Sequence, residues 1–426
     1  MTLLIMLIAL LALLALKVPV SFALLIPSVG YVIMDPTARV GTALQQTVSG
    51  IDSFAILAVP MFILLGNLAN VSGVTDKLYD AAVAAIGHLR GSLGYVNVAT
   101  SFGFSWMSGA AIADAAAMGR VQVPAMVERG YKKEFALGVT GASSLIAPMI
   151  PPSIPAVIYA VTAGVSVGAL FMAGILPALV LVFSLCLTVW FIMRKREDLR
   201  LPKASWKTRG KTTVAALPAA GSAVVILGGI LSGIFTPTEA SGIGVVYILI
   251  LALAYKALSW RRMYRTLLTT VETSGSVLLI VAAAALFGWV LAREQAPQVA
   301  ANLILEITNQ PIVFLILVNV LLLLVGCVLE PTAAILILVP VLLPVAETFG
   351  IDPVHFGIMV IFNLLIGLIT PPVGLVLFVL SSVTKAPVPM VIKGILPFFA
   401  PMVLTLLVIT FLPALTLGLP TLLGFL

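Results

Sequence analysis

Long apolar runs recur along the whole chain and alternate with short polar stretches. They predict ten membrane crossings, at 2–16, 18–34, 50–71, 135–163, 170–193, 212–232, 236–256, 266–291, 355–383 and 394–424. A helical span needs roughly 20 apolar residues, whereas a membrane barrel would show alternating segments of about ten. The pattern therefore predicts an all-α polytopic membrane protein.

Two further apolar regions, 92–127 and 312–345, are interrupted by small and polar residues in the middle. Such an interruption favours a re-entrant hairpin, which enters and leaves on the same side, over a single crossing. An amphipathic stretch precedes each hairpin, at 74–90 and at 295–310. We expect these stretches to form arms along the membrane surface.

The distribution of charge predicts the orientation. Only 9% of the residues are charged, against roughly 25% in soluble domains, so most of the surface faces lipid. An outside N-terminus places all of the 23 Lys and Arg residues except Arg39 and Arg293 on one side, and basic residues accumulate in cytoplasmic loops. We expect a bacterial inner-membrane protein with both termini periplasmic and a cytoplasmic linker at 194–211. The net charge of +7 then reflects orientation, with no nucleic-acid partner.

The chain repeats itself at an offset of 220 residues. Pro151-Pro152 falls on Pro371-Pro372, and the GILP segment 174–177 falls on 394–397. The halves 1–193 and 212–426 each contain five predicted crossings, an arm, a hairpin and a broken helix. Because five is odd, the second half is inverted relative to the first. Inverted repeats are typical of secondary transporters, although a channel can also arise by duplication.

The paired prolines fall in the middle of predicted spans and predict broken helices at 135–163 and 355–383. Each proline removes a backbone donor and clashes with a preceding carbonyl, and a freed carbonyl in lipid costs several kcal/mol (about 2–7) unless something binds it. A cation is one suitable partner. The alternative is a proline kink that neighbouring helices satisfy.

Polar residues at the hairpin tips and in the breaks are the candidate ligands. The first tip carries Ser105 and Ser108, the second contains the segment 326–332 with Gly326 and Glu330, and Ser153 lies in the first break. Small and hydroxyl-bearing residues let oxygen atoms approach a hard cation. Close helix packing by small residues is the alternative.

Charged residues inside or beside spans are further candidates, since intramembrane carboxylates are costly and mark functional sites. Asp114 follows the first tip, and Glu239 lies between two predicted spans, where it would contact substrate or cap a helix. Arg293 lies on the predicted periplasmic face, where it would attract an anion or be an ordinary interfacial residue. Together with Ser105 and Ser153, these residues form the predicted substrate-binding set.

Four motifs carry a resemblance to a known family. They are TPTEA at 236–240, SGAAIADAAAMG at 108–119, IPPS at 150–153 and ITPPVG at 369–374. Together they resemble the large membrane (M) subunit of TRAP transporters, and the likeness extends from the first span to the last. The resemblance implies an elevator mechanism with a scaffold and a transport domain. It also implies two sodium ions coupled to transport, a separate four-helix small (Q) membrane subunit, a periplasmic (P) binding protein and a small organic substrate.

The resemblance also suggests ligands for the sodium ions. The first site would use backbone oxygens of Ser108, Ala110, Ala147, Ile150 and Pro152. Relatives often have a serine where this chain has Ala110, so a hydroxyl contact is lost there while a carbonyl ligand is kept. The 220-residue offset predicts a second site near 326–332, which includes Gly326 and Glu330, together with Gly367, Thr370 and Pro372.

Other functions fit the sequence less well. An enzyme needs a nucleophile, an acid–base pair or a metal cluster, and the chain has only two histidines and no motif of these kinds. A channel filter usually comes from several subunits around an axis. The remaining alternative is another carrier of the ion-transporter superfamily, whose fold the resemblance of the four motifs also implies, working without a binding protein. We expect no cofactor, and the sequence leaves the substrate open between C4-dicarboxylates, sialic acid, other organic acids and ectoine-like solutes.

Overall fold

The computed structural model describes residues 2–426 and is built of helices. It contains twenty α-helices and two short 3-10 segments, with no strand among the described residues. Six helices are long and apolar enough to cross a membrane, or up to nine if each of three sharply bent helix pairs counts as one span. The prediction of an all-α polytopic membrane protein is confirmed.

The N-terminal helices differ from the predicted spans. α1 (Thr2–Ala15) and α2 (Val20–Met34) are only about 21 and 22 Å long at 1.5 Å per residue. Neither alone matches a hydrocarbon core of about 30 Å. α3 (Val40–Ser49) is an additional helix that the apolar pattern did not predict, and α4 (Ala58–Val71) begins later than the predicted span at 50–71.

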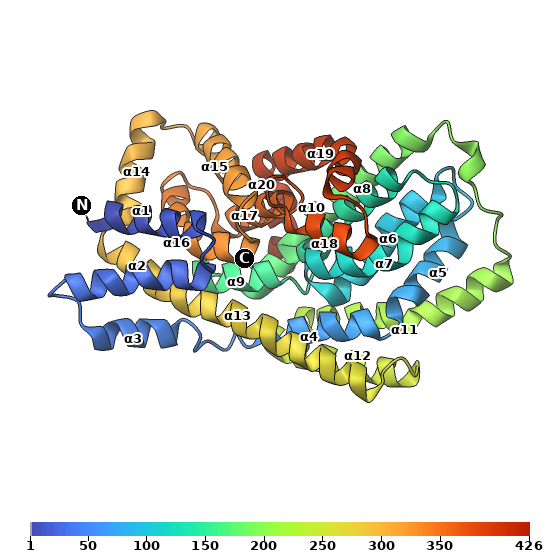
Figure 1. The fold of residues 1–426 in the computed structure, drawn as a ribbon, viewed down its shortest axis with the longest axis horizontal. Coiled ribbons are helices and arrows are strands. Elements are labelled where there is room, and N and C mark those ends of the chain that lie inside the picture. The colour runs from blue at the N-terminus through green and yellow to red at the C-terminus, as the bar shows by residue number, and fades with distance from the viewer. Residues whose placement is uncertain (1) are drawn as a thin grey trace.

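One group of helices, which we call the long-helix layer, consists of α2, α3, α4, α11 (Trp206–Leu231), α12 (Pro237–Ala254) and α13 (Trp260–Arg293). α13 has 34 residues, and α2, α3 and α4 all pack against it. These helices run along the lower part of the view in Figure 1. The short α1 packs on α2, and α5 (Val74–Ile86) packs against α11.

The second group, which we call the hairpin core, contains both interrupted regions and both broken helices. In the first half it comprises α6 (Ser92–Ser108), α7 (Ala111–Glu128), α8 (Lys133–Ser143), the 3-10 segment η1 (Ser144–Met149), α9 (Ile154–Ala163) and α10 (Val167–Met193). In the second half it comprises α15 (Pro311–Gly326), α16 (Pro331–Thr348), α17 (Pro353–Gly367), α18 (Leu375–Thr384), α19 (Val388–Phe411) and α20 (Pro413–Leu422). α14 (Ala296–Ile307) precedes the second hairpin, and η2 (Glu197–Leu199) lies in the linker.

The two halves interlock within the hairpin core. α7 packs against α18 of the other half, and α16 packs against α9, which is the corresponding pair after a shift of 220 residues. The broken helices lie innermost, because every residue from 135 to 153 and from 354 to 369 is buried. The first break therefore lies in the core of the molecule, whereas the second break, at 370–373, is half-buried to exposed.

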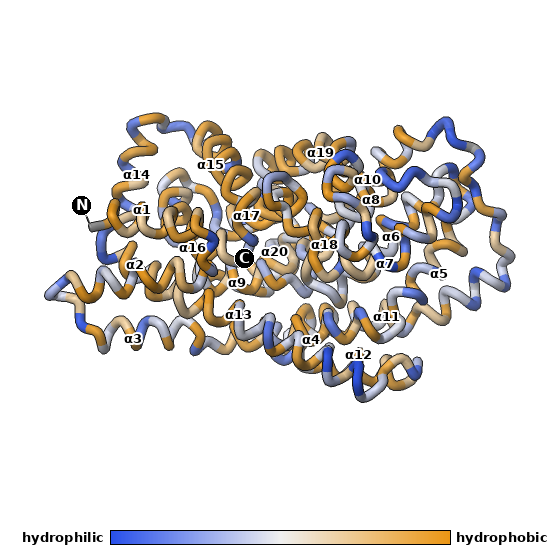
Figure 2. The backbone as a smooth tube through the Cα atoms, viewed as in Figure 1, coloured by the Kyte–Doolittle hydropathy of each residue, from blue (hydrophilic) through white to orange (hydrophobic). Residues whose placement is uncertain are grey.

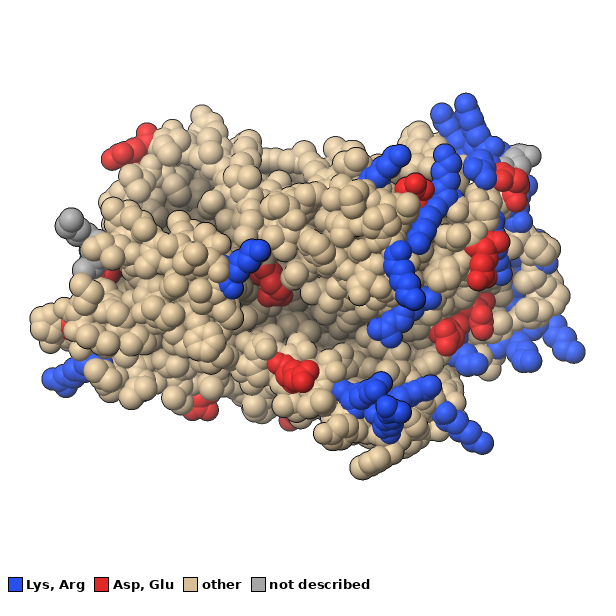
Figure 3. All heavy atoms as spheres, in the orientation of Figure 1, with Lys and Arg blue, Asp and Glu red and all other residues tan. Residues whose placement is uncertain are grey.

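Polar residues gather at one end of the molecule. In Figure 2 the hydrophilic stretches concentrate around α5 and the linker between α10 and α11, while apolar residues cover most of the rest. Figure 3 shows most Lys and Arg side chains at that same end. We call it the basic end. The N-terminus and α14 lie at the opposite end (Figure 1).

Candidate substrate and cation site

A cavity of about 380 Å³ lies between the long-helix layer and the hairpin core. α4 and α13 form one wall, and the two hairpin tips with the adjoining parts of both broken helices form the other. Of the predicted site residues, the lining includes Ser108, Ala110 and Glu330. The structure thus brings residues from both hairpin tips to one central cavity.

The first hairpin tip contacts the first helix break directly. Gly109, at a φ of 63°, joins α6 to α7, and its carbonyl oxygen accepts a hydrogen bond from the Ile154 amide at 3.4 Å. The Gly109 backbone also lies so close to the Pro152 carbonyl that a Cβ atom would overlap it. Glycine is therefore required here both for its backbone conformation and for the close approach.

The second hairpin tip repeats this arrangement. The Cys327 carbonyl accepts a hydrogen bond from the Val373 amide at 3.2 Å, and the backbones of Gly326 and Gly367 touch, with no room for a Cβ atom on Gly367. The Pro151–Pro152 and Pro371–Pro372 peptide bonds are both cis. Each tip is thus held against the break of its own half.

Both breaks leave carbonyl oxygens without a protein donor. Among the described residues, no hydrogen bond reaches the carbonyl oxygens of Ile150, Pro152, Thr370 or Pro372. By contrast, the Gly367 carbonyl accepts from the Thr370 amide at 3.0 Å, and the Ala110 carbonyl accepts from the Asp114 amide at 3.1 Å. Ala147 is fully buried in η1. Ile150 and Pro152 are buried, whereas Thr370 is half-buried and Pro372 is exposed. Carbonyl oxygens without a protein donor are the kind of oxygen ligand that a hard cation needs.

Glu330 serves as the N-cap of α16. Its carboxylate accepts hydrogen bonds from the Ala333 amide at 3.3 Å and from the Thr332 hydroxyl at 2.9 Å. An acidic N-cap satisfies free amides and suits the positive end of the helix dipole. The cap fixes the carboxylate at the wall of the central cavity, where its remaining lone pairs are available.

Asp114 lies on the other side of α7 from the central cavity. It is fully buried, and its Oδ2 accepts a hydrogen bond from the Ser101 hydroxyl at 3.0 Å. The chain of bonds continues from Ser101 to Ser143 at 3.1 Å and from Ser143 to Asn97 at 2.8 Å. Asp114 Oδ1 has no hydrogen-bond partner among the described residues. Its carboxyl group is enclosed by the protein, and it is absent from the lining of the central cavity.

Three other predicted residues serve local structure in this conformation. Glu239 forms a capping box with Thr236 at the start of α12. Of the two roles considered for it, substrate contact and helix capping, it has the second in this structure. The Ser105 hydroxyl donates to the Phe102 carbonyl, and Ser153 caps α9 by accepting from the Ala156 amide. None of the three lines the central cavity.

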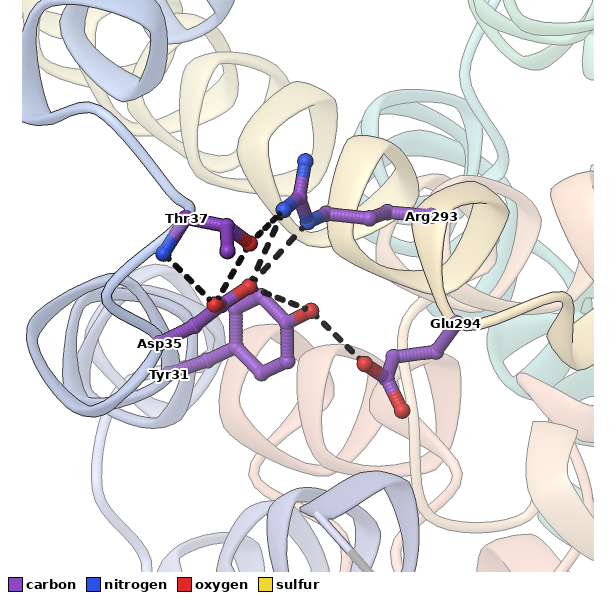
Figure 4. Close-up of polar contacts among 5 residues, drawn as sticks. All are labelled: Tyr31, Asp35, Thr37, Arg293 and Glu294. Atoms are coloured by element: carbon purple, nitrogen blue, oxygen red, sulfur yellow. Dashed lines mark hydrogen bonds and ion pairs between the residues drawn. The ribbon is translucent and has the colours of Figure 1, made fainter.

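Arg293 lies in a polar cluster at the end opposite the basic end, shown in Figure 4. Its guanidinium pairs with Asp35 at 3.1 Å and bonds to the Thr37 hydroxyl, so it links α13 to the end of α2. Tyr31 donates to Glu294 at 2.7 Å. Hydrogen bonds from Thr37, and then the nearby Arg293, lower the pKa of Asp35. The sequence did not predict that Arg293 has an acidic partner within the chain.

A second, larger cavity of about 700 Å³ adjoins the central one, and we call it the vestibule. The two share Asn67, Asn70, Ala116, Arg120 and Thr269 in their linings. The vestibule continues to Arg262 and Arg265 near the start of α13. The central cavity therefore adjoins a space that reaches toward the basic cluster 256–265.

The sequence interpretation missed Arg120, Asn67 and Asn70. Arg120 is a charge within the predicted hairpin 92–127, and this signal alone makes it a candidate by the rule for intramembrane charges. The two asparagines interrupt the apolar span 50–71 three residues apart, on one face of a helix.

The fold and these cavities define a class of protein. A bundle of long apolar helices, with two helix breaks and two hairpin tips meeting at a central cavity, is typical of secondary transporters. Among the described residues no cluster of three or more His, Cys, Asp or Glu side chains is placed to hold a metal ion.

The chain belongs to the family described as the DctM component of the tripartite ATP-independent periplasmic transporter, whose model matches residues 7–415. It is 42% identical to the sialic acid TRAP transporter large permease SiaM of Vibrio cholerae, over 95% of both chains. It is 38% identical to the C4-dicarboxylate large permease DctM of Rhodobacter capsulatus, over 95% of this chain and 96% of that one.

A third relative, the 2,3-diketo-L-gulonate large permease YiaN of Escherichia coli, is 35% identical over 97% of both chains. The fold is similar to the crystal structure of the YdaH transporter of Alcanivorax borkumensis, with a TM-score of 0.59 over 90% of both chains at 16% identity. The predicted family is confirmed.

Proposed function

We propose that the protein is the large permease of a sodium-coupled importer of a small organic acid. The observation that carries this proposal is that two hairpin tips, together with residues beside two helix breaks, line one cavity. The three relatives are named for sialic acid, C4-dicarboxylates and 2,3-diketo-L-gulonate, which are all anionic at neutral pH.

The two helix breaks are the proposed sodium sites. The first uses the free carbonyls of Ile150 and Pro152 with the backbone of the first tip, and the second uses those of Thr370 and Pro372 with the second tip. A monovalent cation needs no cluster of carboxylates, and carbonyl oxygens with some hydroxyls suffice. The symmetry of the two breaks supports equivalent roles for them.

The hairpin core is the proposed transport domain, and the long-helix layer is the proposed scaffold. The central cavity lies at the boundary between them, so an elevator-like movement of the core would carry the cavity across the membrane. The vestibule adjoins this cavity on the side of the basic end. In the proposed inner-membrane orientation the basic end faces the cytoplasm, and the structure corresponds to an inward-facing state.

A separate four-helix membrane subunit and a periplasmic binding protein are the proposed partners. Their proposal rests on the tripartite family and on the many apolar side chains that the long-helix layer exposes, Val224, Val246 and Leu253 among them. The cluster around Arg293 lies at the end that would face the periplasm, where it would meet the binding protein.

Uptake into proteoliposomes tests the proposal. The permease is reconstituted with its small subunit and its binding protein, and uptake of sialic acid, succinate and 2,3-diketo-L-gulonate is measured with and without an inward sodium gradient. We expect sodium-dependent uptake of one of these acids, at rates far below ionic conduction. Uptake that is equal in potassium alone would contradict sodium coupling, and uptake without the binding protein would favour the simpler carrier.

A further inference from the structure

The central cavity is lined by one charged side chain of each sign, and the two differ in their hydrogen-bond partners. Among its described lining residues, only Arg120 and Glu330 carry charge. The Glu330 carboxylate is held by hydrogen bonds from the start of its own helix. Arg120 forms no hydrogen bond or ion pair with any described residue, and its side chain is exposed to the cavity and the vestibule. One guanidinium is therefore free to bind a ligand.

The geometry of α7 fixes the direction of this side chain. Ala113, Ala116 and Arg120 recur three and four residues apart and line the central cavity, as one face of a helix must. Asp114, Met118 and Gln122 are buried on another face. The small side chain at Ala116 leaves room beside the guanidinium. The Asp114 carboxyl group bonds to Ser101 instead, and no hydrogen bond or ion pair among the described residues joins it to Arg120.

Uncharged polar groups surround Arg120 on the opposite wall. Asn67 and Asn70 of α4 and Thr269 of α13 line both cavities with it. Asn70 Oδ1 is enclosed and has no hydrogen-bond partner among the described residues. This oxygen atom is closed off from solvent, whereas the Asn70 residue as a whole lines both cavities. The site thus combines one guanidinium group, which can bind an anion, with uncharged polar groups that suit a hydroxylated or amide-bearing ligand.

We propose that Arg120 binds the acid group of the transported solute while the cavity opens toward the basic end. This inference rests on the proposed function and deepens it, because it assigns the anion subsite to one residue. A guanidinium binds a carboxylate through two parallel hydrogen bonds. Since Arg120 borders both spaces, it also lies where the solute leaves the central cavity for the vestibule.

The first test needs no substrate. Ala116→Cys is introduced in a chain carrying Cys186→Ala and Cys327→Ala, and inside-out vesicles are treated with anionic or cationic methanethiosulfonate reagents. A nearby positive charge speeds the anionic reagent and slows the cationic one. Arg120→Gln should lower the ratio of the two rates about tenfold. Arg129→Gln, at the end of the same helix and outside both linings, should leave the ratio unchanged. An unchanged ratio in Arg120→Gln would overturn the proposal.

The second test uses sialic acid and its uncharged methyl ester with the purified permease complex. Loss of a charge-assisted bond should weaken acid binding about tenfold to a hundredfold in Arg120→Gln, while ester binding should change little. Arg120→Lys should retain part of the affinity for the acid, because lysine keeps the positive charge but cannot form the two parallel hydrogen bonds of a guanidinium. Equal effects on acid and ester would exclude Arg120 as the anion site. If the wild type transports none of the tested acids, the proposed function fails, and the thiol reaction still decides whether Arg120 governs the charge of the cavity.

Discussion

Thr370 donates its hydroxyl hydrogen to the Ile366 carbonyl at 2.7 Å. This bond leaves the lone pairs of its oxygen atom available at the second break, beside the free carbonyls of Thr370 and Pro372. The first break has Ile150 at the corresponding position and therefore carbonyls alone. The two proposed sodium sites thus differ in one hydroxyl.

Thr370→Val tests this difference, because valine keeps the shape and removes the oxygen. Losing one good ligand should cost about 1–3 kcal/mol, which corresponds to a tenfold to hundredfold higher sodium concentration for half-maximal uptake. Thr162→Val, at the end of α9 and outside the break, is the matched control. A normal sodium dependence in Thr370→Val would remove the hydroxyl from the site.

Asp114 is a second case in which one side chain can be tested alone. A carboxyl group buried with a single hydroxyl donor is costly to ionise, and a neutral amide of the same shape does not carry this cost. Asp114→Asn is expected to raise the stability of the purified complex by about 1–3 kcal/mol and to impair uptake. Thermal unfolding and proteoliposome uptake measure the two effects. A less stable variant with normal uptake would reduce Asp114 to a structural residue.

At the scale of single residues, the sequence indicated which residue types could be functional, but it did not indicate which way their side chains point. Asp114 and Arg120 both lie on α7, and the sequence selected only Asp114. The structure turns Asp114 toward Ser101 and turns Arg120 toward the central cavity. Which face of a helix meets a cavity depends on the helices that pack around it, and a uniformly apolar membrane segment gives no periodic signal for that face.

At the scale of elements, the contact between α15 and α17 couples the second tip to the second break. The backbones of Gly326 and Gly367 touch, and a Cβ atom on Gly367 would overlap the Gly326 backbone. Since neither neighbour is a flexible side chain, the two elements have to move apart if the glycine is replaced.

Gly367→Ala is therefore expected to destabilise the protein by about 1–3 kcal/mol, as overpacking does, and to weaken sodium binding. Gly228→Ala in α11 is the matched control, because nothing lies within 4 Å of its added Cβ atom and alanine favours a helix. Sodium-dependent thermal unfolding compares the two variants. Equal sodium responses would show that the tip contact is irrelevant to the site.

The positions of most helices follow from local pattern, whereas their lengths and ends do not. The helix bounds lie within a few residues of the predicted regions 92–127, 135–163, 312–345 and 355–383. α3 has few apolar residues, so hydropathy did not reveal it, and the predicted span at 394–424 divides at Leu412 into α19 and α20. Such ends depend on packing, for instance on the bond of 2.8 Å between His355 of α17 and Thr416 of α20.

At the scale of the whole molecule, the concentration of basic side chains at one end (Figure 3) supports the proposed orientation. Lys203→Cys in the linker, in the chain without native cysteines, should react with an impermeant thiol reagent only in inside-out vesicles. Arg39→Cys at the opposite end should react in intact cells. Labelling of position 203 from outside the cell would overturn the orientation.

The sequence by itself determined the class of protein, the breaks and tips, and the family. These features follow from hydrophobicity, from proline and glycine backbone constraints and from short motifs, all of which act locally along the chain. Only the tertiary structure decided that α7 packs on α18 while α16 packs on α9, that Arg293 pairs with Asp35, and that Arg120 faces the central cavity. Each of these depends on contacts between residues far apart in the sequence, and no local pattern specifies which distant surfaces meet.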